Sequence, residues 1–336
     1  MESAKIKGKF SYSKLNQYVT CPFAYYNKYV QNMFYDKPSV ATEFGVLVHK
    51  IEEKITDSIM KGEPIDYVAL KTFFVEADVP KKSVFDREGG IFGTNVLSKR
   101  YSKDWYSFDS KSGKSYALKA QEYLDKGIYR QENFMKAHPE LKLVGAEVEF
   151  KYIYRDYLFY GFIDRLFQYV DNPKKFVIHD IKTKDKPFND KELVTPLQFV
   201  VYSEALSHKY GDGVEVSCVY DLPIIDIQQP GGTKGFVKRG MKKIDSILDS
   251  IEAEDFAPSP CALCYWCPYS NTNPNQPEEG KNSCPYYSLW NPTTKSYAVK
   301  LEWEGIEKHE KQMAKLLKIE AEETERAGKP FVGGHF

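Results

Sequence analysis

The segment from residue 143 to residue 183 constrains the fold of this chain more strongly than any other part of the sequence. Between Val144 and Phe150, apolar residues occupy every second position and charged residues fill the later gaps, as in a strand buried on one face. The runs YLFYGFIDRLFQYV and FVIHDIKT predict two further strands, separated by a turn at residues 171–175. Because closely consecutive strands usually pair as antiparallel neighbours, the chain is predicted to be organised around a sheet that contains these three strands.

Two aspartates and a lysine are predicted to share one face of this sheet. If Val170 lies opposite Phe176, then Asp164 is opposite Lys182, and Asp180 is diagonal to Asp164. A slip of two residues keeps the shared face, whereas a slip of one destroys it. Charged groups among apolar residues are costly unless they are paired or bound to a metal, so the alternatives are a cation site and a buried Asp–Lys ion pair.

Three helices are predicted around the sheet, over residues 11–30, 44–60 and 193–206. Pro22 is expected to break the first helix beside Cys21. His49 lies at the edge of the buried face of the second helix. Gln198 and Tyr202 are four residues apart and therefore share a face of the third. Taken alone, these positions indicate a helix-edge histidine, a surface glutamine and a core tyrosine.

Residues 62–140 are predicted to form an insertion of helices and loops. Its later part, residues 95–137, holds nine basic residues against five acidic ones, interleaved with tyrosines and Trp105. Such a mixture suits a nucleic-acid strand, through phosphate contacts and base stacking. The alternative, which we favour, is a set of ordinary solvated helices whose aromatic side chains face the core. Residues 296–336 are predicted to contain an amphipathic helix that packs on the domain or on a partner.

Charge and hydropathy exclude two classes of protein. The 47 basic and 47 acidic residues give a formal net charge of zero, which excludes a strongly basic chain but not a local basic groove. No run approaches the roughly 18 apolar residues that span a membrane. The first residues, MESAKIKGKF, lack the apolar core of a signal peptide. We therefore expect a cytoplasmic protein without a membrane partner, in a compartment where disulfides are rare.

The cysteines need an explanation other than disulfides. Four of the six fall in the proline-rich segment 258–290, as Cys261-x2-Cys264-x2-Cys267-x16-Cys284. This segment cannot bury much apolar surface, so a bound metal would supply the missing cross-links. Thiolates suit zinc or an iron–sulfur cluster. The alternative is a set of unrelated buried thiols, and Cys218, in a strand-like run, is expected to be a core residue.

Six short motifs make the chain resemble the RecB-like branch of the PD-(D/E)XK nuclease superfamily. In chain order they are Ser13-Lys14-Leu15 with Cys21-Pro22, Gly45 to His49, Gly161-Phe162-Ile163-Asp164-Arg165, Asp180-Ile181-Lys182-Thr183, Gln198 with Tyr202, and Cys264, Cys267 and Cys284 with their prolines. Each motif is short, and their shared order over residues 10–290 makes the resemblance specific.

The resemblance implies an α/β fold. Its core would be the restriction-endonuclease-like core of PD-(D/E)XK proteins, a central mixed sheet flanked by helices, with the helical insertion and a C-terminal cysteine cluster added. The nuclease domain would span residues 1–295, and residues 296–336 would form a C-terminal helix and tail.

The resemblance also implies a divalent cation, Mg²⁺ or Mn²⁺, on the sheet. Its ligands would be His49, Asp164, Asp180 and the main-chain carbonyl of Ile181. The nitrogen ligand would favour Mn²⁺ over Mg²⁺. Lys182 would orient the attacking water or stabilise the transition state, while Gln198 and Tyr202 would position the metal site or the DNA backbone.

In the iron–sulfur branch of this family, a cysteine near the N-terminus joins the C-terminal cysteines. By that match, Cys21, Cys264, Cys267 and Cys284 would hold a [4Fe–4S] cluster, as in AddB-type nuclease domains and the iron–sulfur exonuclease of CRISPR adaptation. Cys261 is an extra thiol, and the spacing between Cys267 and Cys284 is longer than usual. Zn²⁺ bound by Cys261, Cys264, Cys267 and Cys284 is therefore the alternative.

The implied function is a metal-dependent DNA nuclease, an exonuclease that acts on duplex ends or single strands in recombination, repair or replication. It would work alone or beside a separate helicase or recombinase. One alternative is a non-catalytic DNA-binding subunit of a replication or recombination complex, stabilised by a metal cluster. A zinc-ribbon interaction protein is a third possibility, but it leaves the acids of the predicted hairpin unexplained.

Overall fold

The computed structural model of the protein describes residues 6–35, 40–76, 115–260, 263–264, 267–270, 284, 290–291, 296–297 and 318. The chain divides into two compact units. The first comprises Met1–Asp36, Arg155–Leu158 and Gly235–Lys329, and the second comprises Lys37–Tyr154, Phe159–Lys234 and Pro330–Phe336. Within the described ranges, no helix combines the length and the apolar character needed to cross a membrane.

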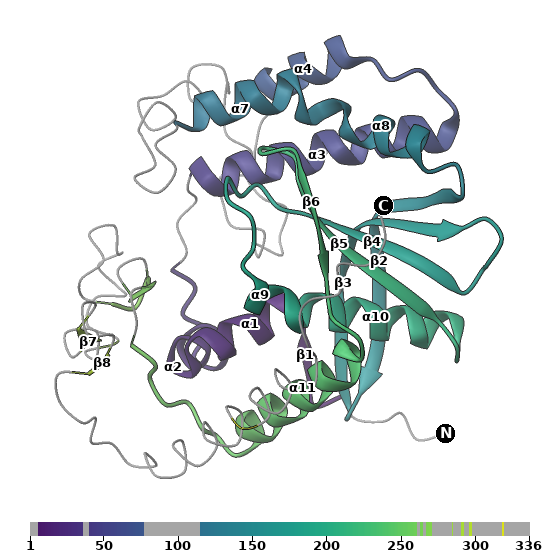
Figure 1. The fold of residues 1–336 in the computed structure, drawn as a ribbon. Helices are drawn as coiled ribbons and strands as arrows, with labels where there is room; N and C mark the ends of the chain where they lie inside the picture. Colours follow the sequence, from purple (N-terminus) through teal and green to yellow (C-terminus); the bar gives the residue numbers. More distant parts are fainter. Residues whose placement is uncertain are drawn as a thin grey trace. The chain divides into compact units, whose positions relative to one another are not determined.

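The second unit is built on a mixed sheet (Figure 1). Its strands are β2 (Leu141–Tyr154), β3 (Tyr157–Tyr169), β4 (Lys175–Ile181), β5 (Glu215–Leu222) and β6 (Ile227–Gly231). They follow the order β3-β4-β5-β6, and β2 also pairs with β3. The β3–β4 and β5–β6 pairs are antiparallel, whereas β4 and β5 are parallel. The predicted antiparallel pairing of the second and third strands, β3 and β4, and the predicted mixed α/β sheet are both confirmed.

Helices cover both faces of this sheet, which explains why β4 reads as a nearly continuous apolar run. On one face, α8 (Arg130–Ala137) places Phe134 against Phe167, with ring centroids 5.1 Å apart. On the other, α10 (Leu197–Tyr210) places Phe199 against Tyr220, with centroids 4.4 Å apart. A strand covered in this way has little room for a charge, so any charged side chain at its end must be held by partners.

Three helices and a short 3₁₀ turn form a second core in the same unit. They are α3 (Val40–Lys61), α4 (Tyr67–Glu76), α7 (Tyr116–Asp125) and η2 (Gly127–Tyr129). Figure 1 shows α3, α4 and α7 grouped together with α8. The buried residues of α3 recur at helical spacing from Phe44 to Ile55, as predicted. Tyr123 is fully buried in this core. For that residue the favoured alternative, an aromatic side chain that faces the core, is confirmed. Tyr101 and Trp105 lie outside the described residues.

The first unit contains β1 (Gly8–Phe10), α1 (Tyr12–Thr20), α2 (Pro22–Tyr25), the π-helix η1 (Tyr26–Val30) and α11 (Phe236–Glu252). The hydroxyl of Ser11 caps α1 by accepting a hydrogen bond from the backbone of Lys14. Cys21 is extended, with φ −162°, and Pro22 begins the next helix, so the predicted break is confirmed. The two-residue strands β7 (Trp290–Asn291) and β8 (Ser296–Tyr297) pair with each other. Apart from isolated positions, the predicted C-terminal helix lies outside the described residues.

The predicted helix over residues 193–206 is in fact two helices. α9 (Asp190–Val194) begins with a capping box at Asn189, and α10 begins at Leu197. Between them, Thr195 has φ −142° and ψ 69°, because the residue before Pro196 is sterically excluded from the helical region. The break leaves Gln198 in the first turn of α10.

Candidate metal centre

The acidic residues of β3 and β4 meet where the two strands cease to pair. The ladder runs from Gln168 opposite Phe176 to Arg165 opposite His179, so Asp164 and Asp180 immediately follow its last pair. The predicted pairing of Val170 with Phe176 is wrong by two residues. The backbone N–H of Val170 donates instead to the carbonyl of Glu140, 2.9 Å away. A slip of two residues does not change the face to which a side chain points. Asp164, Asp180 and Lys182 therefore still point to the same face of the sheet.

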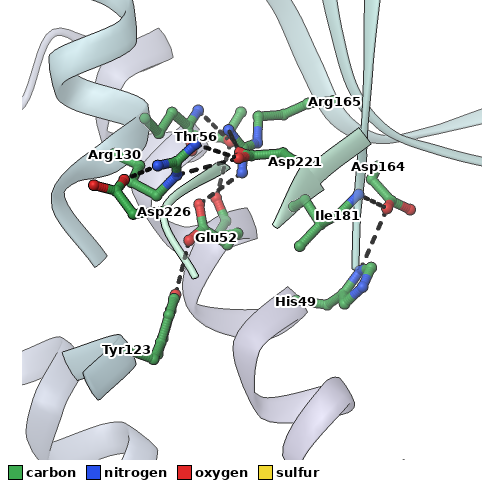
Figure 2. Close-up of polar contacts among 11 residues, drawn as sticks. His49, Glu52, Thr56, Tyr123, Arg130, Asp164, Arg165, Ile181, Asp221 and Asp226 are labelled. Atoms are coloured by element: carbon green, nitrogen blue, oxygen red, sulfur yellow. Dashed lines mark hydrogen bonds and ion pairs between the residues drawn. The ribbon is translucent and has the colours of Figure 1, made fainter. Parts of the chain in front are cut away.

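Three side chains from three elements converge at this point. His49 of α3 places Nδ1 3.6 Å from Oε1 of Glu147 and 3.8 Å from Oδ2 of Asp164. One ligand atom from each of the three residues lies within 4.8 Å of the others. Figure 2 shows His49 pointing from its helix toward Asp164. A nitrogen and two carboxylates at this separation are a donor set that suits Mn²⁺ or Mg²⁺.

Glu147 is the residue that the sequence interpretation missed. It lies in β2 with φ 46°, a left-handed backbone conformation that marks a bulge. Buried positions in β2 are odd-numbered before this point, as at Leu141, and even-numbered after it, as at Phe150. Strict alternation therefore places Glu147 on the wrong face. The change in phase is visible in the sequence, because Leu141 and Leu143 flank a lysine before the pattern shifts.

The two carboxylates dominate the electrostatics around His49. Burial disfavours its charged form, but Asp164 and Glu147 outweigh burial and raise the pKa of His49 to about 9. The centre therefore stabilises positive charge, whether that charge is a proton or a metal ion.

Asp180 is fully buried beside Lys182, whose Nζ lies 2.6 Å from Oδ2. Burial raises the pKa of Asp180 to about 7, with Asp164 adding to the rise and Lys182 opposing it. The Asp–Lys ion pair of the alternative interpretation is therefore formed, and it lies next to the His49–Glu147–Asp164 group. The Lys182 side chain is 30% exposed, whereas that of Asp180 is fully buried.

The backbone of Ile181 also faces this group. Its N–H donates to Oδ2 of Asp164 over 2.7 Å, as Figure 2 shows. In an extended strand the N–H and C=O of one residue point to the same side, so the Ile181 carbonyl faces the same edge of β4.

Gln198 and Tyr202 lie behind the acids, on α10. Nε2 of Gln198 donates to the Tyr202 hydroxyl over 2.8 Å, and both side chains are buried. Burial, reinforced by the charges of Asp180 and Asp164, holds the pKa of Tyr202 well above its usual value. The alternative of a surface glutamine is therefore wrong, because Gln198 is buried on α10.

Four cysteines of the first unit are among the residues that line one cavity of about 220 Å³. They are Cys21, Cys264, Cys267 and Cys284. Burial, together with the neighbouring Cys21 and Cys284, raises the pKa of Cys267 to about 12. No three sulfur atoms of the described cysteines lie within 4.8 Å of one another. Cys261 lies outside the described residues, and Cys218 is buried in β5 of the second unit, as predicted.

A mixed sheet that presents aspartates and a lysine at the end of a β-hairpin is the arrangement expected of a nuclease of the PD-(D/E)XK type. The family model of the PD-(D/E)XK nuclease superfamily matches residues 9–272, and the chain belongs to this superfamily. No curated protein matches the chain. Among solved structures, it is similar to a protein from Eubacterium rectale to which exonuclease activity has been ascribed without being established. The identity is 14%, the match covers 77% of this chain and 86% of the other, and the TM-score is 0.40.

Proposed function

We propose that this protein is a metal-dependent deoxyribonuclease that degrades DNA from ends or along single strands. The observation that carries the proposal is the convergence of His49, Glu147 and Asp164, with Asp180 and Lys182 beside them, in a chain of a nuclease superfamily. Superfamily membership alone leaves open whether a chain has kept its catalytic residues. This chain has kept two acids and a lysine on one face of the sheet.

The cation site would use side chains from three strands and one helix. His49, Asp164, Asp180 and the Ile181 carbonyl are the proposed ligands, and we add Glu147 because of its distance to His49. A divalent cation held there would activate water for attack on a phosphodiester and offset the charge of the phosphate. The histidine favours Mn²⁺, since Mg²⁺ prefers an all-oxygen shell.

Lys182 and the pair on α10 have supporting roles in this proposal. The ammonium of Lys182 would stabilise negative charge developing on the phosphate, at a position fixed by Asp180. Gln198 and Tyr202 would hold the buried side of Asp180 in place, because a hydrogen-bonded pair next to a carboxylate limits its rotamers.

We further propose that the four-cysteine cavity holds a [4Fe–4S] cluster. Its support is that Cys21 lines the same cavity as Cys264, Cys267 and Cys284, although about 240 residues separate them in sequence. The alternative, a zinc site, would use Cys261, Cys264, Cys267 and Cys284 and would leave Cys21 out.

DNA digestion with and without a free end tests the proposed activity. Purified protein is incubated with Mn²⁺, with Mg²⁺ or with EDTA, on end-labelled linear DNA and on covalently closed single-stranded circles. We expect the linear DNA to be degraded only with metal, and the circles to survive. Cleavage of the circles would indicate an endonuclease. Binding to both DNAs without cleavage of either would contradict the proposal and favour a non-catalytic DNA-binding subunit.

A further inference from the structure

A network of buried charged side chains lies beside the candidate metal centre in the second unit (Figure 2). Glu52, Arg165 and Asp221 are each at most 2% exposed. Nη2 of Arg165 donates to Oε2 of Glu52 over 2.8 Å, and Nη1 lies 3.5 Å from Oδ2 of Asp221. One guanidinium therefore joins two carboxylates where a charge is strongly disfavoured unless it is paired.

The two remaining carboxylate oxygens also have partners. The Tyr123 hydroxyl donates to Oε1 of Glu52 over 2.8 Å. Nε and Nη2 of Arg130 donate to Oδ1 of Asp221 over 3.2 Å and 3.0 Å. Each of the four oxygens of Glu52 and Asp221 thereby has a partner, whereas Nε and Nη1 of Arg165 donate no hydrogen bond within the described residues and Nη1 makes only the ion-pair contact.

Each member of this network lies next to a residue of the candidate metal centre. Glu52 is one helical turn after His49 on α3, and Arg165 directly follows Asp164 on β3. The Asp221 carbonyl accepts a hydrogen bond from the backbone N–H of Lys182 over 2.8 Å. The network therefore joins α3 to β3 and β5, and the backbone hydrogen bond from Lys182 to Asp221 links it to the end of β4.

We propose that Glu52, Arg165 and Asp221 are positioning residues that set the placement of α3 against the sheet, and thereby the distance from His49 to Asp164. This inference rests on the proposed function, because it assigns the network a role in metal binding. Apolar side chains would hold α3 in place without fixing its rotation, whereas hydrogen bonds between charged groups have a defined direction. None of the three residues is proposed to touch the substrate or the metal.

A double variant can separate the effect of the network on stability from its effect on the position of His49. Arg165→Met alone would leave Glu52 buried without its cation and is expected to fold poorly. Glu52→Gln/Arg165→Met removes both charges and keeps an acceptor for Tyr123, while Arg130 still pairs with Oδ1 of Asp221 and Oδ2 loses its contact with Arg165. We expect this protein to fold, with an unfolding temperature below that of wild type but above that of Arg165→Met. Its Mn²⁺ affinity, measured by titration calorimetry, should fall by about tenfold to a hundredfold, as found when outer partners of metal ligands are lost.

Two comparisons complete the experiment. Leu141→Ala removes an apolar side chain from the core formed with Phe134 and Phe167, and it should lower stability without changing Mn²⁺ affinity. In the double variant, kcat for DNA should fall while KM for DNA stays within about twofold, because the DNA contacts are intact. If the double variant does not fold, Glu52→Gln alone carries the same test, with a smaller expected loss of Mn²⁺ affinity.

A folded variant that binds Mn²⁺ as tightly as wild type and keeps its kcat would overturn the inference and leave the proposed nuclease intact. A wild-type protein that binds no Mn²⁺ would instead overturn the proposed function, and this inference with it. The two failures are therefore distinguishable in one titration series.

Discussion

At the scale of single residues, Glu147 shows how one backbone angle decides what a side chain can reach. Its φ of 46° interrupts the alternation of β2 and brings Oε1 within 3.6 Å of His49. Glu149, two positions later, is exposed, and Nζ of Lys151 lies 2.6 Å from its Oε1. The two glutamates thus differ in position and share their chemistry.

This pair provides a matched test of the ligand set. Glu147→Gln removes one anionic ligand, and we expect Mn²⁺ affinity and the rate of DNA cleavage to fall by about tenfold or more. Glu149→Gln should change neither quantity beyond about twofold. Titration calorimetry and a cleavage assay measure both effects. Equal behaviour of the two variants would remove Glu147 from the site.

His179 is a second residue whose chemistry follows from its surroundings. Its ring is 1% exposed and packs against Phe134 and Phe167, with centroids 4.5 Å and 4.9 Å away. Burial lowers the pKa of His179 to about 3. Asp221 opposes this shift, whereas Arg165, Arg130 and His138 add to it.

Because the pKa is depressed in the folded state, unfolding takes up a proton below the unfolded value of about 6.5. The contribution of neutral His179 to the free energy of unfolding is fully present above pH 6.5. It is lost as the pH falls toward 3, by about 1.4 kcal/mol per pH unit. His179→Phe removes this dependence. In EDTA, the free energy of unfolding in urea should fall less steeply for the variant than for wild type as the pH is lowered from about 6 to 4. The difference between the two proteins should change by about 1.4 kcal/mol per pH unit. A difference that does not change with pH would show that His179 titrates normally.

At the scale of elements, the sequence predicted the strands well because their apolar alternation is a direct consequence of burial. It predicted α3 for the same reason, since Phe44 to Ile55 repeat at helical spacing. It did not predict the register of β3 with β4. The register of a hairpin follows its turn, and this turn has backbone N–H groups of Lys174 and Lys175 donating to Asn172, which strand periodicity does not show. Two acids and a lysine were still placed on one face, because a slip of two residues leaves side-chain direction unchanged.

The contact between β6 and α10 gives a prediction at this scale. A Cβ atom at Gly231 would lie 2.5 Å from Cε2 of the fully buried ring of Phe199, which has no space to move. Gly231→Ala should therefore destabilise the protein by about 1–3 kcal/mol. Gly45, on α3, is the control. Among the described residues its added Cβ would meet just Thr183 Oγ1, at an ordinary 3.6 Å, and alanine favours the helix.

Gly45→Ala should accordingly stabilise the protein by roughly 0.5–1 kcal/mol. Urea unfolding monitored by circular dichroism measures both changes. If Gly231→Ala were neutral, α10 would pack on the sheet less tightly than described.

At the scale of the whole molecule, cysteines that are far apart in the sequence line one cavity. Cys21 follows the last turn of α1, and the other three thiols of the cavity come from residues 264–284. Spacing alone could not choose between zinc and iron–sulfur, because it does not show whether Cys21 or Cys261 completes the set. Closing so long a loop through a bound cluster would restrict the unfolded chain and add bonding free energy to folding.

Anaerobically purified protein should be brown and contain about four iron atoms per chain. Cys21→Ser should lose the colour and most of the iron, together with solubility. Cys261→Ser should keep all three, and so should Cys218→Ala, since that thiol lies in β5 of the other unit. Visible absorption and elemental analysis decide the matter. A colourless protein with one zinc, unaffected by Cys21→Ser, would contradict the cluster and leave the nuclease proposal standing.

The central claim is that the acids at the end of the β3–β4 hairpin form the active metal centre of a nuclease. The most direct measurement is the Mn²⁺-dependent rate of cleavage of end-labelled DNA by wild type and by Asp164→Asn, which keeps the acceptor for the Ile181 N–H. We predict that the wild type cleaves only with metal, and that Asp164→Asn folds normally but loses at least about a hundredfold in rate. An Asp164→Asn protein that cleaves DNA at the wild-type rate would contradict the account.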